Sequence, residues 1–196
     1  MTDKHINNFF SGTELISKLI NKKKIKKLAE EIFKVKKKQG RLFFLGVGGS
    51  AGNCSHAVND FRKICNIESY CPTDNVSELT ARINDEGWET SYQEWLKSSN
   101  LSRKDAIFIM SVGGGNLKKN ISVNLIKSII FAKKKNAKVF SIVGRKDGYA
   151  FKNADVCIDI PNIDNKLITP YSEGFQAIIW HCLVSHPILQ DNKTKW

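Results

Sequence analysis

No part of the sequence is apolar over the roughly 20 consecutive residues that a membrane-spanning helix requires. No secretory signal is present either, because the N-terminus is polar and carries Asp3, His5 and the pair Asn7-Asn8. These absences argue against membrane-spanning and exported proteins. We therefore expect a soluble, cytoplasmic protein.

The sequence also lacks the cysteine patterns of disulfide-rich and zinc-ribbon proteins. Its cysteines are odd in number, contain no C-x-x-C pair and lie mostly in apolar contexts; they are Cys54, Cys65, Cys71, Cys157 and Cys182. Such usage favours reduced thiols in a cytoplasm over a disulfide framework.

The net charge of +12 is compatible with nucleic-acid binding, but the other sequence features of nucleic-acid-binding proteins are missing. The lysine runs at 22–24, 36–38 and 133–135 fall on expected surface helices. No aromatic residues interleave with them, and no helix-turn-helix or zinc-finger spacing occurs. We interpret the lysines as solvated helix faces whose field attracts a phosphorylated metabolite.

The order of apolar runs predicts a doubly wound α/β fold with a five-stranded parallel sheet. We expect a single domain over residues 1–196, with an N-terminal helix at 8–39 that ends at Gly40, an α/β core at 41–186 and a polar tail at 187–196. Strands are predicted at 41–47, 67–71, 105–112, 138–143 and 156–160, and helices at 53–65, after 74–75, 88–97, 116–137, 149–154 and 171–185. Alternating strands and helices indicate βαβ units, which place helices on both faces of a parallel sheet.

Two glycine-rich turns, at 46–50 and 111–116, each follow an apolar run and precede an expected helix. Free backbone N–H groups at a helix N-terminus bind anions, so the repeat predicts a phosphate site. Residues 46–51 also satisfy the G-x-G-x-x-[GA] dinucleotide fingerprint. The acidic residue that this fingerprint expects is poorly matched by Glu68 or Asp74, and an NAD-binding oxidoreductase leaves the second turn unexplained.

Over residues 8–186 the chain resembles the sugar isomerase (SIS) domain family, and within it the phosphoheptose isomerases. The resemblance rests on the first turn, Gly46-x-Gly48-Gly49-Ser50, and on a helix that carries a histidine and, four residues later, a carboxylate, here His56 and Asp60. The last helix of the family carries a glutamine and a histidine eight residues apart. Glu173 and His181 reproduce that spacing.

This resemblance implies roles for the four side chains. It makes Asp60 the catalytic base and His181 the acid, and it implies a zinc ion held by His56, Asp60, Glu173 and His181. Two imidazoles and two carboxylates are compatible with zinc. Each residue also has an ordinary structural interpretation, since His181 is equally a candidate core histidine and Asp60 is a candidate partner for Arg62 or Lys63.

The chain departs from the family at two places. Asp60 is one methylene shorter than the family's glutamate, and the second turn lacks three hydroxyls of the family's Ser-Thr-Ser-Gly-Asn-Ser loop. The backbone N–H groups of 113–116, the Asn116 amide and Lys118 or Lys119 remain as anion donors; a plain flexible turn is the alternative. A third cluster at 73–78 either positions sugar hydroxyls or caps the next helix. The substrate-binding residues expected in all are Gly49, Ser50, Asn53, Asp74, Ser111, Gly113, Gly114, Gly115, Asn116 and Glu173.

The function implied by the resemblance is aldose–ketose isomerisation of a phosphorylated sugar through an enediol. The substrate implied is sedoheptulose 7-phosphate, which feeds heptose and surface-polysaccharide synthesis. A homotetramer, or at least a dimer, is implied as well. The alternative is a non-catalytic SIS module that binds a sugar phosphate and regulates a partner, and the missing hydroxyls and the short Asp60 favour it.

Overall fold

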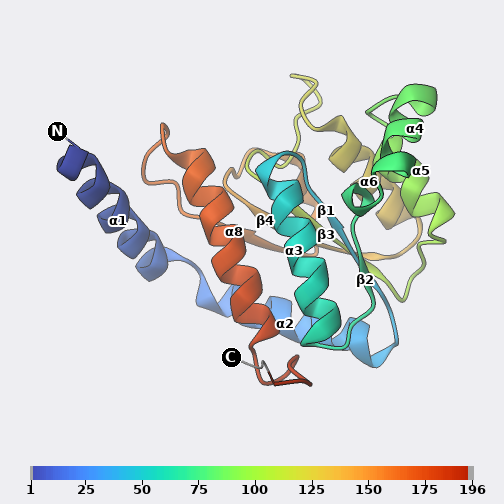
Figure 1. Cartoon of the computed structure of the whole chain (residues 1–196), viewed down its shortest axis with the longest axis horizontal. Helices are drawn as coiled ribbons and strands as arrows, with labels where there is room; N and C mark the ends of the chain where they lie inside the picture. The colour runs from blue at the N-terminus through green and yellow to red at the C-terminus, as the bar shows by residue number, and fades with distance from the viewer. Residues whose placement is uncertain (1, 194–196) are drawn as a thin grey trace.

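A five-stranded sheet, parallel throughout, forms the centre of the computed structural model, which describes residues 2–193 (Figure 1). The strand order is β2-β1-β3-β4-β5, so the chain winds in both directions from β1 and β3. The strands are β1 (Leu42–Leu45), β2 (Ser69–Tyr70), β3 (Ala106–Ser111), β4 (Lys138–Val143) and β5 (Val156–Asp159). The predicted fold class is confirmed.

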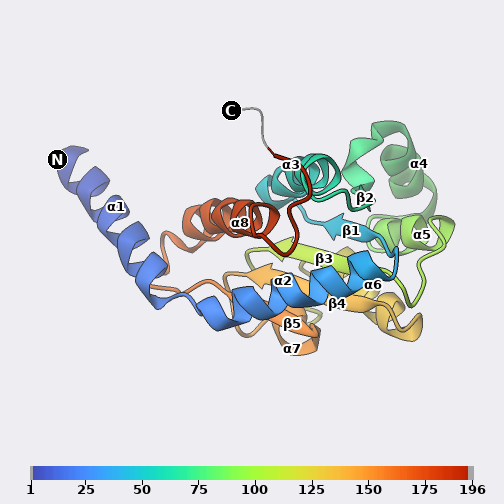
Figure 2. The ribbon, with the colours of Figure 1, turned by 90° about the horizontal axis from the view of Figure 1, so that it is seen from below.

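Helices cover both faces of the sheet (Figure 2). One face packs against α2 (Lys22–Lys37), α3 (Gly49–Lys63) and α8 (Ile168–Val184). Helix α1 (Thr2–Leu19) extends beyond the sheet and contacts α8, where Phe9 stacks on Tyr171 with ring centroids 4.8 Å apart. The opposite face packs against α4 (Val76–Glu86), α5 (Ser91–Ser98), α6 (Val123–Lys134) and α7 (Tyr149–Asn153), and a short 3-10 helix, η1 (Pro72–Asp74), precedes α4.

Alternate side chains of each strand enter two separate cores, because successive residues of a strand point to opposite faces. Phe44 and Phe108 stack on the α3–α8 side with ring centroids 5.0 Å apart. Phe43 packs edge-on against Trp95 of α5 on the other side, with centroids 5.5 Å apart. Burial on both faces explains why the strands are almost continuously apolar.

The single helix predicted at 8–39 was wrong, since two helices occupy this region. Asn21 interrupts the helix and caps α2, where its side chain accepts a hydrogen bond from the Lys24 N–H. Short polar side chains compete with helix hydrogen bonds in this way. The apolar spacing continues across the break and so conceals it.

Other boundaries differ from the prediction as well, and α3 begins at Gly49 rather than at 53. Helix α6 begins at Val123 rather than at 116, because Asn116 and Ile121 exchange backbone hydrogen bonds and fold residues 116–122 into a loop. The tail is ordered as far as it is described: Leu189 is buried, and the N–H groups of residues 191 and 192 donate to the Ile64 carbonyl. Residues 194–196 of the tail lie outside the described residues.

All five cysteines are free thiols, as expected. Within residues 2–193, none of the helices has the length and apolar character needed to cross a bilayer.

A buried ion pair joins the starts of β1 and β3. Asp105 is 2% exposed and accepts hydrogen bonds from the backbone and guanidinium of Arg41 and from the backbone and hydroxyl of Ser102. Burial alone would raise the pKa of Asp105, but these hydrogen bonds outweigh it and hold the pKa below its ordinary value. The carboxylate therefore stabilises the fold in its charged form.

We expect Asp105→Asn to lower the free energy of unfolding at pH 7 by about 2–4 kcal/mol, because an amide leaves buried donors unpaired. A carboxylate whose pKa is lower in the folded than in the unfolded protein stabilises the fold at pH values above its unfolded pKa of about 4. This stabilisation is lost as the pH falls through the pKa of the folded protein. The difference between wild type and variant should therefore shrink between pH 4 and pH 2 in urea titrations. Glu14→Gln, which breaks an exposed pair with Lys18, is the control. A difference that stays constant or grows in acid would contradict the assignment.

Candidate active site

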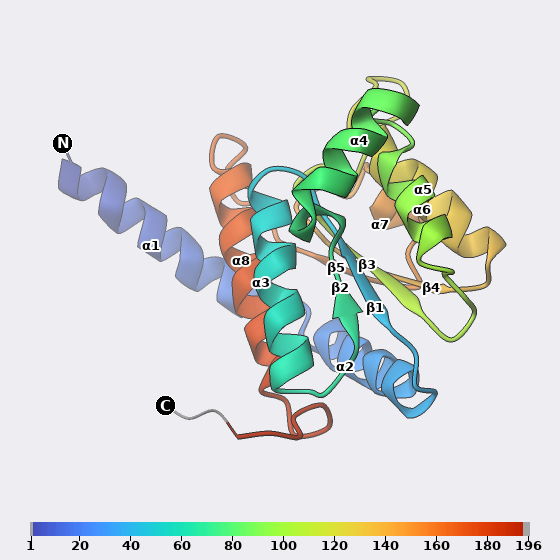
Figure 3. The same ribbon diagram turned by 45° about the vertical axis from the view of Figure 1, so that its right-hand side comes forward.

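Helices α3 and α8 lie side by side on the sheet (Figure 3). A buried amide fixes their register: Gln176 of α8 is 0% exposed and donates from Nε2 to Ser50 Oγ at 3.0 Å. Asn53 of α3 donates from Nδ2 to Gln176 Oε1 at 2.9 Å and to the Glu173 carbonyl at 3.0 Å. Because hydrogen bonds are directional, they set which residues of the two helices meet.

Two histidines and a carboxylate meet in the groove between these helices. His56 and Asp60 are four residues apart on one face of α3, with His56 Nε2 3.8 Å from Asp60 Oδ2. From α8, His181 Nε2 lies 4.0 Å from the same oxygen. One ligand atom of each residue lies within 4.8 Å of the others. The structure therefore brings together three of the four residues predicted to hold a metal.

The chemistry of these donor atoms fits a cation. His181 Nδ1 lies 2.8 Å from the Ala177 carbonyl, which only accepts, so the ring proton resides on Nδ1. Its Nε2 atom then faces Asp60 Oδ2 at 4.0 Å, and the other Asp60 oxygen accepts from Asn59 Nδ2 at 2.8 Å. Electron-rich atoms facing one another, each oriented by an outer hydrogen bond, are typical of a metal site. Three protein ligands also leave a coordination position open for a substrate.

Trp180 forms the wall behind both imidazoles. Its ring stacks on His181 with centroids 3.4 Å apart and contacts His56 with centroids 4.6 Å apart. The indole is 1% exposed, whereas the histidine side chains are 59% and 54% exposed. His181 is thus not a core histidine, and Asp60 forms its ion pairs with the two histidines, while Arg62 donates to the Ser69 carbonyl.

Glu173, the fourth predicted ligand, is not among the residues whose ligand atoms converge here. Its carboxylate packs against Gly49, where an added Cβ would lie 2.5 Å from Glu173 Oε2. Eight residues place Glu173 and His181 on one side of α8 but separate them by roughly 12 Å of helix rise. A side chain at position 49 would require the Glu173 carboxylate to move.

The other residues predicted at the first turn have mixed positions. Ser50 is 2% exposed, and its hydroxyl accepts a hydrogen bond from the Gln176 side chain. The hydroxyl therefore lies under α8 rather than in an open anion-binding site. Asp74 Oδ1 accepts a hydrogen bond from Ser55 Oγ at 2.6 Å. Ser55 is the residue of α3 that precedes His56, so this contact places Asp74 beside α3. Its neighbour Asn75 caps α4 by accepting from the Glu78 N–H, as the capping alternative predicted.

The second turn is an ordered loop rather than a flexible connection. Ser111 Oγ accepts from the Gly114 N–H at 3.0 Å, and the Asn116 N–H donates to the Ile121 carbonyl. Gly114 and Gly115 have positive φ angles of 71° and 82°, which favour glycine. Two of the four backbone N–H groups expected to bind an anion are thus used inside the loop. The expected cradle at residues 113–116 is smaller than predicted.

Sequence reasoning missed three residues of this region: Gln176, Trp180 and Arg145. A glutamine within the apolar stretch of α8 was a detectable signal, because a buried amide needs partners. Arg145 follows β4 and lines a cavity of about 110 Å³ with the second loop. Its position at the carboxyl edge of a parallel sheet, where α/β proteins bind ligands, was the available signal.

A sequence model of the SIS domain matches residues 10–144. The chain belongs to the SIS domain family. A phosphoheptose isomerase from Sulfurimonas denitrificans is 32% identical over 172 residues, which cover 84% of this chain and 80% of that protein. The lincomycin biosynthesis protein LmbN from Streptomyces lincolnensis is 31% identical over 158 residues, 75% of this chain but only 56% of LmbN. This SIS domain thus matches little more than half of LmbN.

Solved structures show the same fold. A phosphoheptose isomerase from Francisella tularensis aligns with a TM-score of 0.82 at 16% identity and covers 96% of this chain and 98% of that chain. The enzyme from Neisseria gonorrhoeae aligns with a TM-score of 0.78 at 18% identity and covers 94% and 97%. The resemblance predicted from the sequence is confirmed.

For metal binding by this SIS domain, we expect His56→Ala and His181→Ala each to weaken zinc affinity by more than about 100-fold, because each removes a donor that converges on Asp60. Competition with a chromophoric chelator measures the affinity. Glu173→Gln is the matched comparison, and its affinity should stay within about threefold of wild type because it lies outside the cluster. An equal loss in Glu173→Gln would restore the four-residue set.

Proposed function

We propose that this SIS domain is an aldose–ketose isomerase of a phosphorylated sugar, with sedoheptulose 7-phosphate as the favoured substrate and a heptose 7-phosphate as its product. The observation that carries the proposal is the convergence of His56, Asp60 and His181 in one groove. The names of the matched relatives and structures, which include phosphoheptose isomerases, support the same activity.

The chain's own residues supply the proton transfers. Asp60 removes the proton from the carbon beside the substrate carbonyl and returns it to the neighbouring carbon, while His181 Nε2 exchanges a proton with the two sugar oxygens. The Ala177 carbonyl accepts from Nδ1 of His181, so Nε2 is the atom available for this exchange, and it serves in this way only while it is not bound to a cation. His56, Asp60 and His181 would hold a divalent cation such as zinc. Such a cation, when bound, polarises the carbonyl and stabilises the charge of the enediolate.

The short side chain of Asp60 still reaches the cluster. Its Oδ2 atom lies within 4.0 Å of both histidine Nε2 atoms, although the family's glutamate is one methylene longer. A displaced base costs rate, but here the carboxylate remains next to the acid with which it must cooperate. This geometry supports the enzyme over a module that only binds sugar phosphates.

A second copy of the chain is expected to complete the site. Both histidines are half exposed, and large apolar side chains on α1 are exposed too: Ile6 at 52%, Phe10 at 67% and Leu19 at 58%. Ile178 of α8 borders a groove of about 440 Å³ between α1, α2 and α8. Exposed apolar surface of this kind favours a homo-oligomer, for which we propose a tetramer. The free thiols favour a cytoplasmic location.

Isomerisation through an enediol predicts exchange with solvent. Incubation with candidate sugar phosphates in heavy water should place deuterium on carbon in the product and the recovered substrate. Asp60→Asn should reduce this exchange by about 10²–10⁴-fold, because it removes the base. Glu68→Gln, which changes a carboxylate just before β2 and outside the groove, should retain it. A sugar phosphate that binds without any exchange would instead support the regulatory module.

The proposed assembly predicts that Phe10→Lys lowers the molar mass measured by light scattering after gel filtration, because a charge would be buried between copies. Ile130→Lys, at a 49% exposed apolar position on α6, should leave the mass unchanged. A monomeric wild type, or a Phe10→Lys variant of unchanged mass, would argue against this interface.

A further inference from the structure

The second glycine loop has few donors of its own to offer an anion. Its one hydroxyl within residues 111–116, that of Ser111, is 7% exposed and already accepts from the Gly114 N–H. The Asn116 N–H donates to the Ile121 carbonyl, and the Asn116 side-chain oxygen accepts from the Lys119 N–H. A phosphate group that binds here needs donors from another part of the chain.

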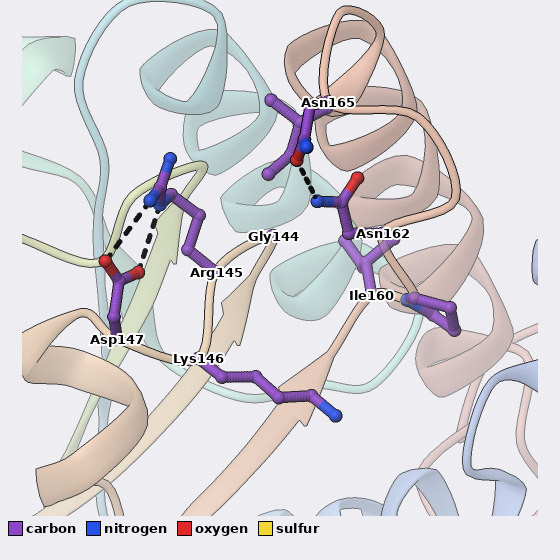
Figure 4. Close-up of a pocket in the computed structure, with 9 residues that line it drawn as sticks. Gly144, Arg145, Lys146, Asp147, Ile160, Asn162 and Asn165 are labelled. Carbon is purple, nitrogen blue, oxygen red and sulfur yellow. Dashed lines mark hydrogen bonds and ion pairs between the residues drawn. The ribbon is translucent and has the colours of Figure 1, made fainter.

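Arg145 supplies such donors from the next strand. It follows Gly144, whose N–H donates to the Val112 carbonyl at 3.0 Å and so joins the loop after β4 to the second glycine loop. Arg145 lines the cavity of about 110 Å³ together with loop glycines and Lys119. It also lines a neighbouring cavity of about 490 Å³ that continues toward Asn162 and Asn165 (Figure 4). The guanidinium therefore lies where the two cavities meet.

Asp147 occupies the binding face of this guanidinium. Arg145 Nε donates to Asp147 Oδ1 at 3.0 Å and Nη2 donates to Oδ2 at 3.2 Å, a two-pronged contact that Figure 4 shows. Both side chains are more than half exposed, at 51% and 59%. An exposed pair of this kind is weak. A phosphate dianion offers more charge and three acceptor oxygens in the geometry that a guanidinium fork matches.

We propose that Arg145, together with Lys119, binds the phosphate group of a sugar phosphomonoester at the second glycine loop, and that Asp147 is the exchangeable partner that this phosphate displaces. The inference rests on the proposed function for the class of ligand. Asp147 makes the site selective for phosphorylated sugars, because a neutral sugar forms no charged contact with Arg145 that would offset the loss of the Arg145–Asp147 ion pair. Arg145 thus compensates for the hydroxyls that the second loop lacks.

Two variants with opposite expected effects test the proposal. Calorimetric titration of the full chain with inorganic phosphate should give a dissociation constant at least about tenfold larger for Arg145→Gln than for the wild type. Asp147→Asn should bind phosphate about three- to tenfold more tightly, because it removes the competing carboxylate. Lys146→Gln is the control: it removes a charge from the same loop but faces Asp159 and is absent from the smaller cavity.

Turnover separates this inference from the proposed function. With a phosphorylated sugar, Arg145→Gln should raise KM and leave kcat nearly unchanged, since the contact is equal in ground and transition states; Arg145→Lys should recover part of the affinity. If phosphate binding depends on Arg145 but the wild type turns over no sugar phosphate, the proposed function is overturned and this inference stands. Normal turnover and phosphate affinity in Arg145→Gln, or weaker binding in Asp147→Asn, would overturn this inference alone.

Discussion

The register between α3 and α8 is the constraint on which the site depends. Apolar packing between helices is not directional, so it permits a helix to rotate or slide by one residue. The buried Gln176 amide prevents this, because it must satisfy its hydrogen bonds with Ser50 and Asn53. With that register fixed, His181 faces Asp60 about 1.4 turns beyond Gln176 on α8, and a rotation of one residue would turn its imidazole away by about 100°.

Charge is divided between two ends of the molecule. The α3–α8 groove holds the Asp60 carboxylate beside His56 and His181, which suits a cation and a proton transfer. The carboxyl edge of the sheet near the second loop holds Arg145 and Lys119, which suit a phosphate. This separation matches a substrate that reacts at one end and is held at the other. The contact at the remote end then holds the substrate in the site equally in the ground and transition states.

The sequence predicted the sheet well because its strands are short apolar runs bounded by turns, and β4 was placed at its observed limits of 138 and 143. It also predicted that His56 and Asp60 share a helix face, since this depends only on helix geometry. It failed at Asn21, where a local side-chain cap overrides the apolar spacing. The spacing of Glu173 and His181 fixes a face of the helix but not a distance from a metal, so the sequence does not decide whether Glu173 reaches the cluster. For Gln176 the sequence signals only that a buried amide needs partners; the partners themselves, Ser50 and Asn53, lie on a distant segment and are not given by a local pattern.

The central claim is that two histidines and one carboxylate of the α3–α8 groove form a single metal-binding, proton-transferring site. X-ray absorption at the zinc edge of the zinc-loaded protein tests it most directly. The account predicts two imidazole ligands together with oxygen ligands, at about 2.0–2.2 Å. Sulfur scattering at about 2.3 Å, or a spectrum without imidazole, would place the metal elsewhere in the chain and contradict the account.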